Sequence, residues 1–329
     1  MAGPFSRRRR RLRGVADLLL DERSSREALD EAAAELYDVF TAISPRRDSS
    51  SADTMLPSGV ALSPAGAATC TRDGLRTAIF ARGLRDAITE AGRRFAGETI
   101  EVIYAGTGPF AVLAVPLMTI FSPSDVRFTL IDCHEESLRS VRALLRHFGF
   151  GRFIRAVVAA DASVYRHATA VHVVVAEIMQ RALGIEPQVE VSRNLGSQLR
   201  ANGILVPERV TVDLVFGDPD REGTRSFAGT VAELSDATLD VHTITLTDVP
   251  RSTHAMYATT VRAFGRHVLR EFDSGLTYPQ VIWGLTNVRE GERLAFWYEL
   301  GARPGIRWER AARSVNRRGQ RDFGADDRA

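Results

Sequence analysis

The sequence contains no lysine, so all 43 of its basic residues are arginine. A Walker-type phosphate loop needs a lysine, and this class of nucleotide-binding site is therefore excluded. The arginine bias is more typical of a GC-rich genome than of a nucleic-acid ligand, and a formal net charge of +2 gives the surface no strong basic field. We interpret the basic run at residues 7–11 as a solvated, disordered segment and expect no nucleic-acid partner.

Cysteine is also scarce, with Cys70 and Cys133 the two examples. Two cysteines cannot build a disulfide framework or a cysteine-rich zinc site, so we predict that the protein holds no metal. No apolar run reaches the roughly 18 residues that span a bilayer, and the apolar run at 15–20 is too short and too close to acidic residues for a signal peptide. We therefore expect a cytoplasmic protein without a membrane partner.

The first part of the chain, residues 1–60, is predicted to be a helical arm followed by a polar linker. Apolar residues recur at helical spacing over 14–44, and Ser24-Ser-Arg-Glu27 resembles a capping box. The apolar stripe comprises Leu18, Leu19, Leu29, Ala33, Leu36, Val39 and Phe40. Such an arm can cover the core, pair with a second subunit, or do both, and a homodimer is therefore one expectation.

Residues 61–207 alternate between helical and strand patterns. Apolar, β-branched runs predict strands at 100–104, 126–131, 154–158 and 171–176. Amphipathic segments predict helices at 73–91, 110–121 and 135–148. This order is typical of an α/β fold with a doubly wound, Rossmann-like parallel sheet.

The pattern changes after Pro207. Segments 210–216, 238–246 and 294–300 alternate between apolar and polar residues and are separated by turn residues. We therefore predict a second, smaller β-rich, barrel-like domain at 208–310. The segment at 311–329 is a charged tail.

Glycines and acids follow successive predicted strands. Gly106 and Gly108 come after the first strand, where they let a ligand approach the backbone, although the third glycine of the dinucleotide fingerprint is missing. Asp132 ends the second strand, where an acid grips a ribose or caps the next helix. Asp161 follows the third strand, where it can receive an adenine amino group. Together they predict S-adenosylmethionine as the ligand.

Two glutamates, Glu177 and Glu186, flank the loop after the strand at 171–176. Facing carboxylates would hold one planar cation, and a guanidinium suits them because its donors match a carboxylate bidentately. A solvated loop that happens to contain two acids is the alternative.

In these motifs the chain resembles the class I S-adenosylmethionine-dependent methyltransferases, and within them the protein arginine methyltransferases. The resemblance covers residues 70–216 and is carried by Arg72-Asp-Gly-Leu-Arg76-Thr77, Ala105-Gly-Thr-Gly-Pro109, Ala176-Glu177-Ile-Met179 and Leu199-Arg-Ala-Asn-Gly203-Ile-Leu-Val-Pro207. It implies that the last of these forms a helix, a glycine turn and a strand. It also implies that the first holds the cofactor carboxylate through its second arginine, and that Glu177 and Glu186 are the catalytic pair of a double-glutamate loop.

The residues that this resemblance assigns to ligands form two sets. The cofactor-binding set is Arg76, Ala105, Gly106, Gly108, Asp132, Cys133, Asp161, Ala162 and Glu177. The substrate-binding set is Met179, Glu177 and Glu186. Cys70 aligns near positions that limit the number of methyl groups in that family, or is simply a small buried thiol.

The chain also departs from the family pattern. Tyr104 replaces the first glycine of the loop, residues 51–79 contain no Tyr or Trp for an aromatic helix over the cofactor, and the Thr-His-Trp loop has Thr277, Tyr278 and Trp283 as positional candidates. Because these parts usually build a peptide groove, we favour methyl transfer to free L-arginine or a related small guanidino molecule. In type, the chain resembles the bacterial free-arginine N-methyltransferases of nitrosourea natural-product pathways. A protein arginine methyltransferase, a non-catalytic methyltransferase-like binding module and, more distantly, a nucleic-acid methyltransferase are the alternatives.

Overall fold

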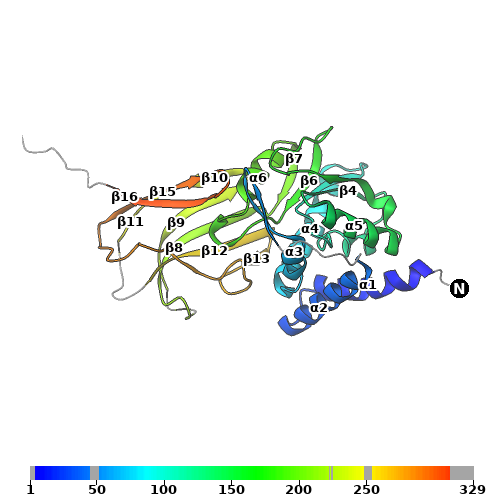
Figure 1. The fold of residues 1–329 in the computed structure, drawn as a ribbon, viewed down its shortest axis with the longest axis horizontal. Coiled ribbons are helices and arrows are strands. Elements are labelled where there is room, and N and C mark those ends of the chain that lie inside the picture. The colour runs from blue at the N-terminus through cyan, green and yellow to red at the C-terminus, as the bar shows by residue number, and fades with distance from the viewer. Residues whose placement is uncertain (1–3, 45–51, 222, 224, 248–253, 312–329) are drawn as a thin grey trace, which may run out of the picture.

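The computed structural model describes residues 4–44, 52–221, 223, 225–247 and 254–311. A parallel sheet with its helices occupies one end of the long axis, and antiparallel strands occupy the other (Figure 1). The α/β fold class with an added β-rich part is thereby confirmed. Most of the polar linker predicted after the helical arm lies outside the described residues, and so does almost all of the charged tail.

The parallel sheet has the strand order β5-β4-β3-β6-β7. Its strands are β3 (Ile100–Ala105), β4 (Val126–Asp132), β5 (Ile154–Ala159), β6 (Val171–Ala176) and β7 (Leu199–Val206). All four pairings are parallel. The chain runs outward from β3 to β5 and returns on the other side at β6, so a topological switch point lies between the carboxyl ends of β3 and β6.

Helices cover both faces of this sheet. The helices are α4 (Gly74–Arg94), α5 (Glu135–Phe148) and α6 (Gln188–Gly196). Residues of α4 and α5 share one core cluster with Tyr104 and Phe128, whereas Val191 and Leu195 of α6 pack with the opposite face of β3 and β6. The predicted helices at 73–91 and 135–148 are confirmed within a few residues.

The predicted helix at 110–121 is wrong. This segment forms a succession of turns with one short 3₁₀ helix, η1 (Leu117–Thr119). Ala111 has a left-handed φ of 44°, and Pro116 has no N–H to continue a helical ladder. The apolar pattern therefore reports burial, since Leu113, Ala114 and Val115 are all core residues.

The expectation of a helix at the start of residues 199–207 is also wrong. Helix α6 ends at Gly196, and Leu199 already begins β7. The glycine turn is instead an irregularity inside this strand, where Asn202 has a positive φ of 67° and the pairing register with β6 shifts.

The N-terminal arm packs within the chain. Helix α1 (Pro4–Leu20) and helix α2 (Arg26–Ile43) lie against α4 and α5 (Figure 1). The Ser25 hydroxyl, rather than that of Ser24, caps α2 by accepting the N–H of Ala28 at 3.2 Å. Leu18 is an exception to the predicted stripe because it is 45% exposed.

The basic run at 7–11 is helical, which corrects its interpretation as a disordered segment. The guanidinium of Arg9 donates to the carbonyl of Phe148 at 2.7 Å, at the end of α5, and stacks over the ring of Phe150 at 4.9 Å. Carbonyls at a helix carboxyl end favour cations, so this arginine fastens the arm to the sheet domain.

The β-rich part contains two antiparallel sheets. The first is ordered β10-β9-β8-β12-β13, with β14 beside β12, and the second β11-β15-β16. The strands are β8 (Arg209–Gly217), β9 (Ser226–Ser235), β10 (Thr238–Val241), β11 (Thr243–Thr245), β12 (His254–Phe264), β13 (His267–Leu269), β14 (Gln280–Val281), β15 (Arg293–Glu299) and β16 (Gly305–Arg310). The single strand predicted at 238–246 is thus two strands in different sheets.

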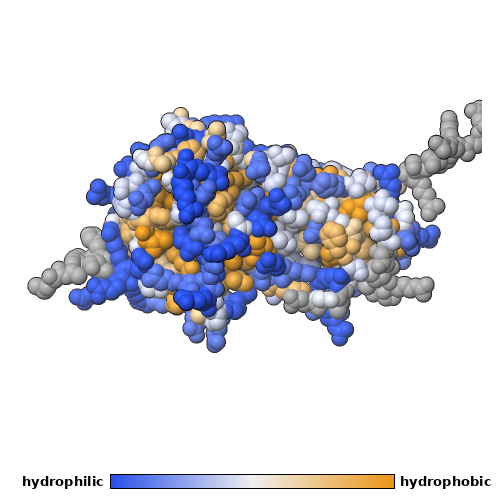
Figure 2. Space-filling view, turned by 180° about the vertical axis from the view of Figure 1, so that it is seen from behind, coloured by the Kyte–Doolittle hydropathy of each residue, from blue (hydrophilic) through white to orange (hydrophobic). Residues whose placement is uncertain are grey.

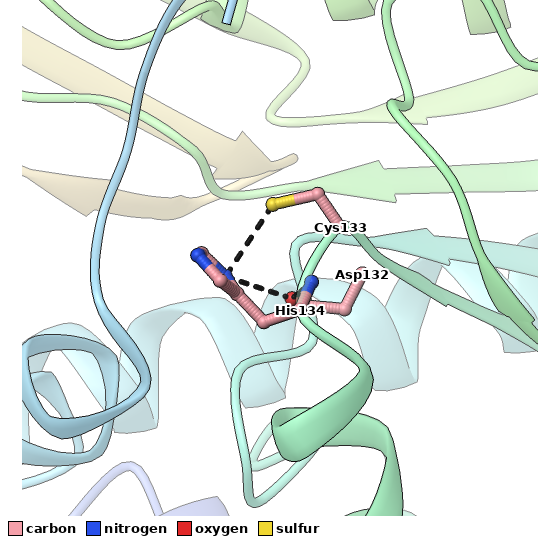
Figure 3. Close-up of side chains that lie close together, drawn as sticks. All are labelled: Asp132, Cys133 and His134. Atoms are coloured by element: carbon pink, nitrogen blue, oxygen red, sulfur yellow. Dashed lines mark hydrogen bonds and ion pairs between the residues drawn. The ribbon is translucent and has the colours of Figure 1, made fainter. Parts of the chain in front are cut away.

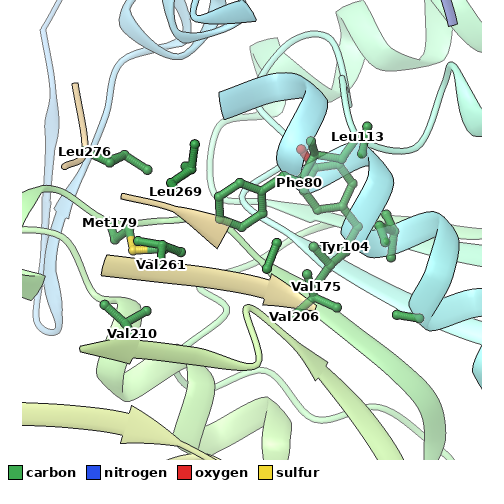
Figure 4. Close-up of a cluster of buried hydrophobic side chains, with 14 of the residues drawn as sticks. Phe80, Tyr104, Leu113, Val175, Met179, Val206, Val210, Val261, Leu269 and Leu276 are labelled. Carbon is green, nitrogen blue, oxygen red and sulfur yellow. The ribbon is translucent and has the colours of Figure 1, made fainter. Parts of the chain in front are cut away.

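One continuous hydrophobic cluster joins the two parts (Figure 4). Phe80 of α4, Tyr104 of β3 and Val206 of β7 belong to the same buried cluster as Val261 of β12. Tyr104 is 3% exposed and belongs to this core. The β-rich part therefore has a fixed position relative to the ends of the parallel strands.

A small hairpin and a short helix precede α4, and neither has a counterpart among the predicted elements. They are β1 (Thr54–Leu56), β2 (Gly59–Ala61) and α3 (Pro64–Cys70). The N–H of Val60 donates to the carbonyl of Ile185 at 2.9 Å, so the hairpin lies on the loop that contains Glu186.

The outer surface is mixed rather than uniformly apolar. The face in Figure 2 is largely hydrophilic, with separate hydrophobic areas. None of the helices in the described part of the chain has the length and apolar character to cross a bilayer.

Candidate active site

A cavity of about 300 Å³ lies at the carboxyl ends of β3, β4, β5 and β6. Its lining also includes residues of the β1–β2 hairpin, α3 and the first turns of α4. Nearly all predicted site residues line it, namely Arg76, Gly106, Gly108, Asp132, Cys133, Asp161, Ala162, Glu177, Met179 and Glu186. Ala105 does not, because its side chain is buried in the cluster beneath α6. Their roles stay predictions.

The glycine turn after β3 adopts backbone angles that other residues avoid. Gly106 has φ 71° and Gly108 has φ 54°. A Cβ at Gly106 would lie 2.5 Å from Cγ1 of Ile178, and one at Gly108 would lie 3.1 Å from Cβ of Ala67. Both the positive φ and the close neighbours therefore require glycine here.

We expect Gly106→Ala to lower the free energy of unfolding by about 2–4 kcal/mol, because it combines an unfavourable φ with a clash against Ile178. Denaturant unfolding measures this change. Gly92→Ala is the matched control, since Gly92 is an exposed position of α4 with no heavy atom within 4 Å of the added Cβ. It should be neutral or stabilising by up to about 1 kcal/mol. Equal effects of the two substitutions would contradict the assignment.

Asp132 organises the end of β4. Its Oδ2 accepts the N–H of Gly108 at 2.8 Å, and its Oδ1 accepts the N–H of His134 at 2.9 Å. The carboxylate is 7% exposed and joins the glycine turn to the start of α5. Asp132 does not cap α5, because the N-cap residue is His134 and no side chain caps this helix. Each carboxylate oxygen has a second lone pair, so the ribose-binding interpretation stays a prediction.

His134 is a site residue that sequence reasoning missed. Its Nδ1 lies 3.4 Å from Oδ1 of Asp132 and 3.4 Å from Sγ of Cys133 (Figure 3). Hydrogen bonding to Asp132, and then to Cys133, raises the pKa of His134 to about 10, so the ring is an imidazolium at neutral pH. Its Nε2 lies 3.0 Å from the hydroxyl of Thr54, which ties the β1–β2 hairpin to the cavity.

The ligand atoms of Asp132, Cys133 and His134 lie within 4.8 Å of one another, a spacing that a metal ion could bridge. Each carboxylate oxygen of Asp132 accepts a backbone N–H group, and Nε2 of His134 lies 3.0 Å from the Thr54 hydroxyl, so these groups have protein partners without an ion. The absence of a metal stays a prediction.

Asp161 also lines the cavity and lies just after the end of β5. Its Oδ1 accepts the N–H of Ser163 at 2.8 Å and the hydroxyl of the same residue at 2.7 Å. Within the described residues no hydrogen bond to Oδ2 is found, so this oxygen can accept a ligand donor. The neighbouring Ala162 is 8% exposed and contributes an apolar surface.

Arg76 and Glu177 form an ion pair across the cavity. Arg76 is in the first turn of α4, where its N–H is capped by Asp73 at 3.1 Å, and Glu177 directly follows β6. Their side chains are 15% and 14% exposed. Burial alone would lower the pKa of Arg76, but Glu177 raises it well above its usual range, and burial raises the pKa of Glu177 although Arg76 opposes this. We take both groups as charged, because the pair is in direct contact.

Glu186 is almost fully buried in the same cavity, with 7% of the residue exposed. Burial, followed by the charge of Glu177, raises its pKa to about 7. A carboxyl group with this pKa binds or releases a proton near neutral pH, which suits acid–base work.

The loop between the two glutamates has an unusual backbone. Ala182, Leu183 and Ile185 all have left-handed φ values between 54° and 68°. Contacts from the β-rich part hold this shape, since the hydroxyl of Tyr298 donates to Leu183 O at 2.6 Å and the N–H of Ile185 donates to Pro304 O at 2.9 Å. Such strain in non-glycine residues is found where the surrounding structure imposes a functional geometry.

Other predicted positions lie apart from this cavity or at its margin. Cys70 lines it, and burial raises the pKa of its thiol. Thr277 is fully buried beside Ser274, whereas Tyr278 and Trp283 are 47% and 87% exposed and do not line the cavity. Their neighbours Gly275 and Leu276 do line the cavity, and no local sequence motif predicts this position.

Comparisons with known proteins gave matches to solved structures alone, since no family model and no curated protein matches the sequence. One similar structure is the Trypanosoma brucei PRMT1 enzyme–prozyme heterotetrameric complex with AdoHcy, at 14% identity and a TM-score of 0.48, covering 70% of this chain and 86% of that chain. Another is Arabidopsis thaliana protein arginine methyltransferase 10, at 15% identity and a TM-score of 0.43, covering 66% of this chain and 84% of that chain. The function of the present chain is therefore argued from its own side chains.

Proposed function

We propose that this protein is an S-adenosylmethionine-dependent N-methyltransferase that methylates a guanidino nitrogen of free L-arginine or a related small molecule. The observation that carries the proposal is the meeting of Glu177 and Glu186 in one cavity with the glycine turn, Asp132 and Asp161. The donor-binding residues lie at successive strand ends, and the two glutamates lie beside them at the switch point of the sheet. A role in a bacterial natural-product pathway is part of the proposal and rests on the sequence resemblance.

The residues present fit the methyl donor. Asp132 offers its remaining lone pairs to a ribose, Oδ2 of Asp161 can accept from an adenine amino group, and Arg76 can bind a carboxylate in addition to Glu177. When bound, S-adenosylmethionine supplies a methyl group whose bond to sulfur breaks with the electron pair left on sulfur. Its net positive charge suits a cavity in which Glu186 and Asp161 form no ion pair among the described residues.

The two glutamates would orient the acceptor. A guanidinium cannot be deprotonated in advance at neutral pH, so its attacking nitrogen must be positioned and then relieved of a proton. Glu177 is held by Arg76 and stays an anion that accepts N–H donors. Glu186, with a pKa of about 7, is the better candidate to take the proton once the new N–C bond forms.

We expect a pH dependence that follows Glu186. Below its pKa of about 7 the carboxyl is protonated, so it neither attracts a guanidinium nor accepts a proton. kcat/KM for the guanidino substrate should therefore rise with pH through about 7 and then level off. The corresponding rise in kcat should occur at lower pH, because the bound guanidinium stabilises the ionised form of Glu186 and so lowers its pKa. Initial rates across pH measure both, and a flat profile through neutrality would contradict this assignment.

The cavity favours a small acceptor over a peptide. Leu56 and Ala61 of the hairpin line it, and the bond from Val60 to Ile185 places the hairpin on the loop that would receive a polypeptide.

Incubation with isotope-labelled methyl donor tests the proposal against its alternatives. We expect label on free L-arginine and little on an arginine-rich peptide. Label on the peptide alone would instead identify a protein arginine methyltransferase. Calorimetry that detects donor binding without any transfer would identify a binding module.

A further inference from the structure

Among the residues that line the cavity, three cationic side chains differ in their partners. Arg76 is paired with Glu177, and His134 contacts Asp132 and Thr54. Arg181 is exposed, and in the described part of the structure no hydrogen bond or ion pair of its guanidinium is found. It is thus a cation of the cavity whose whole guanidinium can bind an anionic ligand group, whereas Arg76 already shares its guanidinium with Glu177.

The position of Arg181 is fixed by the loop that also positions Glu186. Arg181 begins η3 (Arg181–Leu183), whose backbone is held by the bond from Ala182 N–H to the Thr259 hydroxyl at 3.0 Å. Glu186 is buried, whereas Arg181 is exposed and lines the same cavity. The loop therefore presents an anion at the inner end of the cavity and a cation at its rim.

We propose that Arg181 is a subsite for the α-carboxylate of the acceptor, which makes the substrate a free guanidino amino acid. The inference rests on the proposed function, because it needs the guanidinium of the same molecule at Glu186. A guanidino amino acid carries its carboxylate at the end opposite to the guanidinium, matching the charge order of the cavity. An arginine–carboxylate contact is planar and bidentate, so it adds orientation as well as affinity.

The subsite also predicts discrimination between close analogues. Agmatine has the guanidinium and aliphatic chain of arginine but no carboxylate, and it would place an ammonium near the Arg181 cation. An arginine residue inside a peptide has no free carboxylate either. Both lack the attractive contact, so the selectivity comes from one side chain at the rim rather than from the glutamate pair.

Steady-state kinetics of the full-length protein with S-adenosylmethionine tests this subsite. With wild type, we expect kcat/KM for L-arginine to exceed that for agmatine by about 10- to 100-fold, the usual range for a charge-assisted bond. Arg181→Gln should raise KM for arginine by a similar factor, leave kcat and KM for the methyl donor nearly unchanged, and bring the two acceptors close to equality. Arg181→Glu should reverse the preference, so that agmatine becomes the better acceptor. Arg181→Lys keeps the positive charge and should therefore keep part of the preference for arginine.

Arg289→Gln is the matched control, because Arg289 is an exposed arginine of the β-rich part that does not line the cavity. An arginine-to-agmatine ratio that is the same in wild type and Arg181→Gln would overturn the subsite while leaving the proposed function intact. A raised KM for the methyl donor instead of arginine would overturn it as well, by assigning Arg181 to the donor. Failure of every guanidine to be methylated would overturn the proposed function, and the subsite with it.

Discussion

Glu186→Gln is expected to reduce methyl transfer to guanidines by about 10²- to 10⁴-fold while leaving the affinity for S-adenosylmethionine nearly unchanged. The amide keeps the size of the side chain but can neither attract the guanidinium nor accept its proton. Glu186 has no contact with Arg76 or Asp132 among the described hydrogen bonds and ion pairs, so the donor site should persist. Single-turnover rates measure the first effect and calorimetry the second.

The same substitution should change how stability depends on pH. The pKa of Glu186 rises from 4.5 to about 7 on folding, so the folded state binds its proton more tightly than the unfolded state. The contribution of Glu186 should therefore lower the free energy of unfolding of the wild type by about 3 kcal/mol as pH rises from 4.5 through 7. This decrease should be absent from Glu186→Gln. Glu290→Gln, at an exposed position, is the control for both experiments. Full guanidine methylation by Glu186→Gln would contradict the proposed function.

The parallel sheet and its strand-end residues are predictable from the sequence because their signals are local. Runs such as the one at 171–176 are β-branched and fully buried, and the turn at Gly106 demands glycine through its own φ. Parallel strands bring their carboxyl ends to one edge, so acids that follow them meet in space. For this reason the amino-acid pattern alone predicts that Asp132, Asp161 and Glu177 lie close together, and all three line one cavity.

Other parts depend on packing that leaves no local pattern. The apolar periodicity at 110–121 is typical of a helix, although a left-handed Ala111 and the imide of Pro116 divert the chain into turns. The capping serine of α2 differs by one position from the predicted one, because Ser24 and Ser25 look alike in sequence and the choice depends on which hydroxyl faces Ala28.

Several residues that line the cavity, among them those of the β1–β2 hairpin, likewise have no recognisable pattern in the sequence. The hairpin at 54–61 is too short to produce a period, and it is held by a backbone bond to Ile185 more than a hundred residues away. His134 resembles an ordinary residue at the start of a helix, and only its contacts with Asp132 and Thr54 distinguish it. Arg181 is one of 43 arginines. Two features of the described structure distinguish it: it lines the cavity, and no hydrogen bond or ion pair of its guanidinium is found there.

Arg76→Ala is expected to abolish donor binding and to destabilise the protein by about 3–5 kcal/mol, because it leaves Glu177 charged and largely buried without its partner. Arg93→Ala on the same helix is the control, since the Arg93 side chain is 76% exposed and its ion pair with Glu90 should contribute at most about 1 kcal/mol. The double variant Arg76→Met with Glu177→Met replaces both charges by apolar chains and should recover most of the stability but none of the methyl transfer. Unfolding and single-turnover measurements on the three variants separate the two roles. If the double variant recovered activity together with stability, the pair would be a structural feature of the cavity wall and the donor site would lie elsewhere.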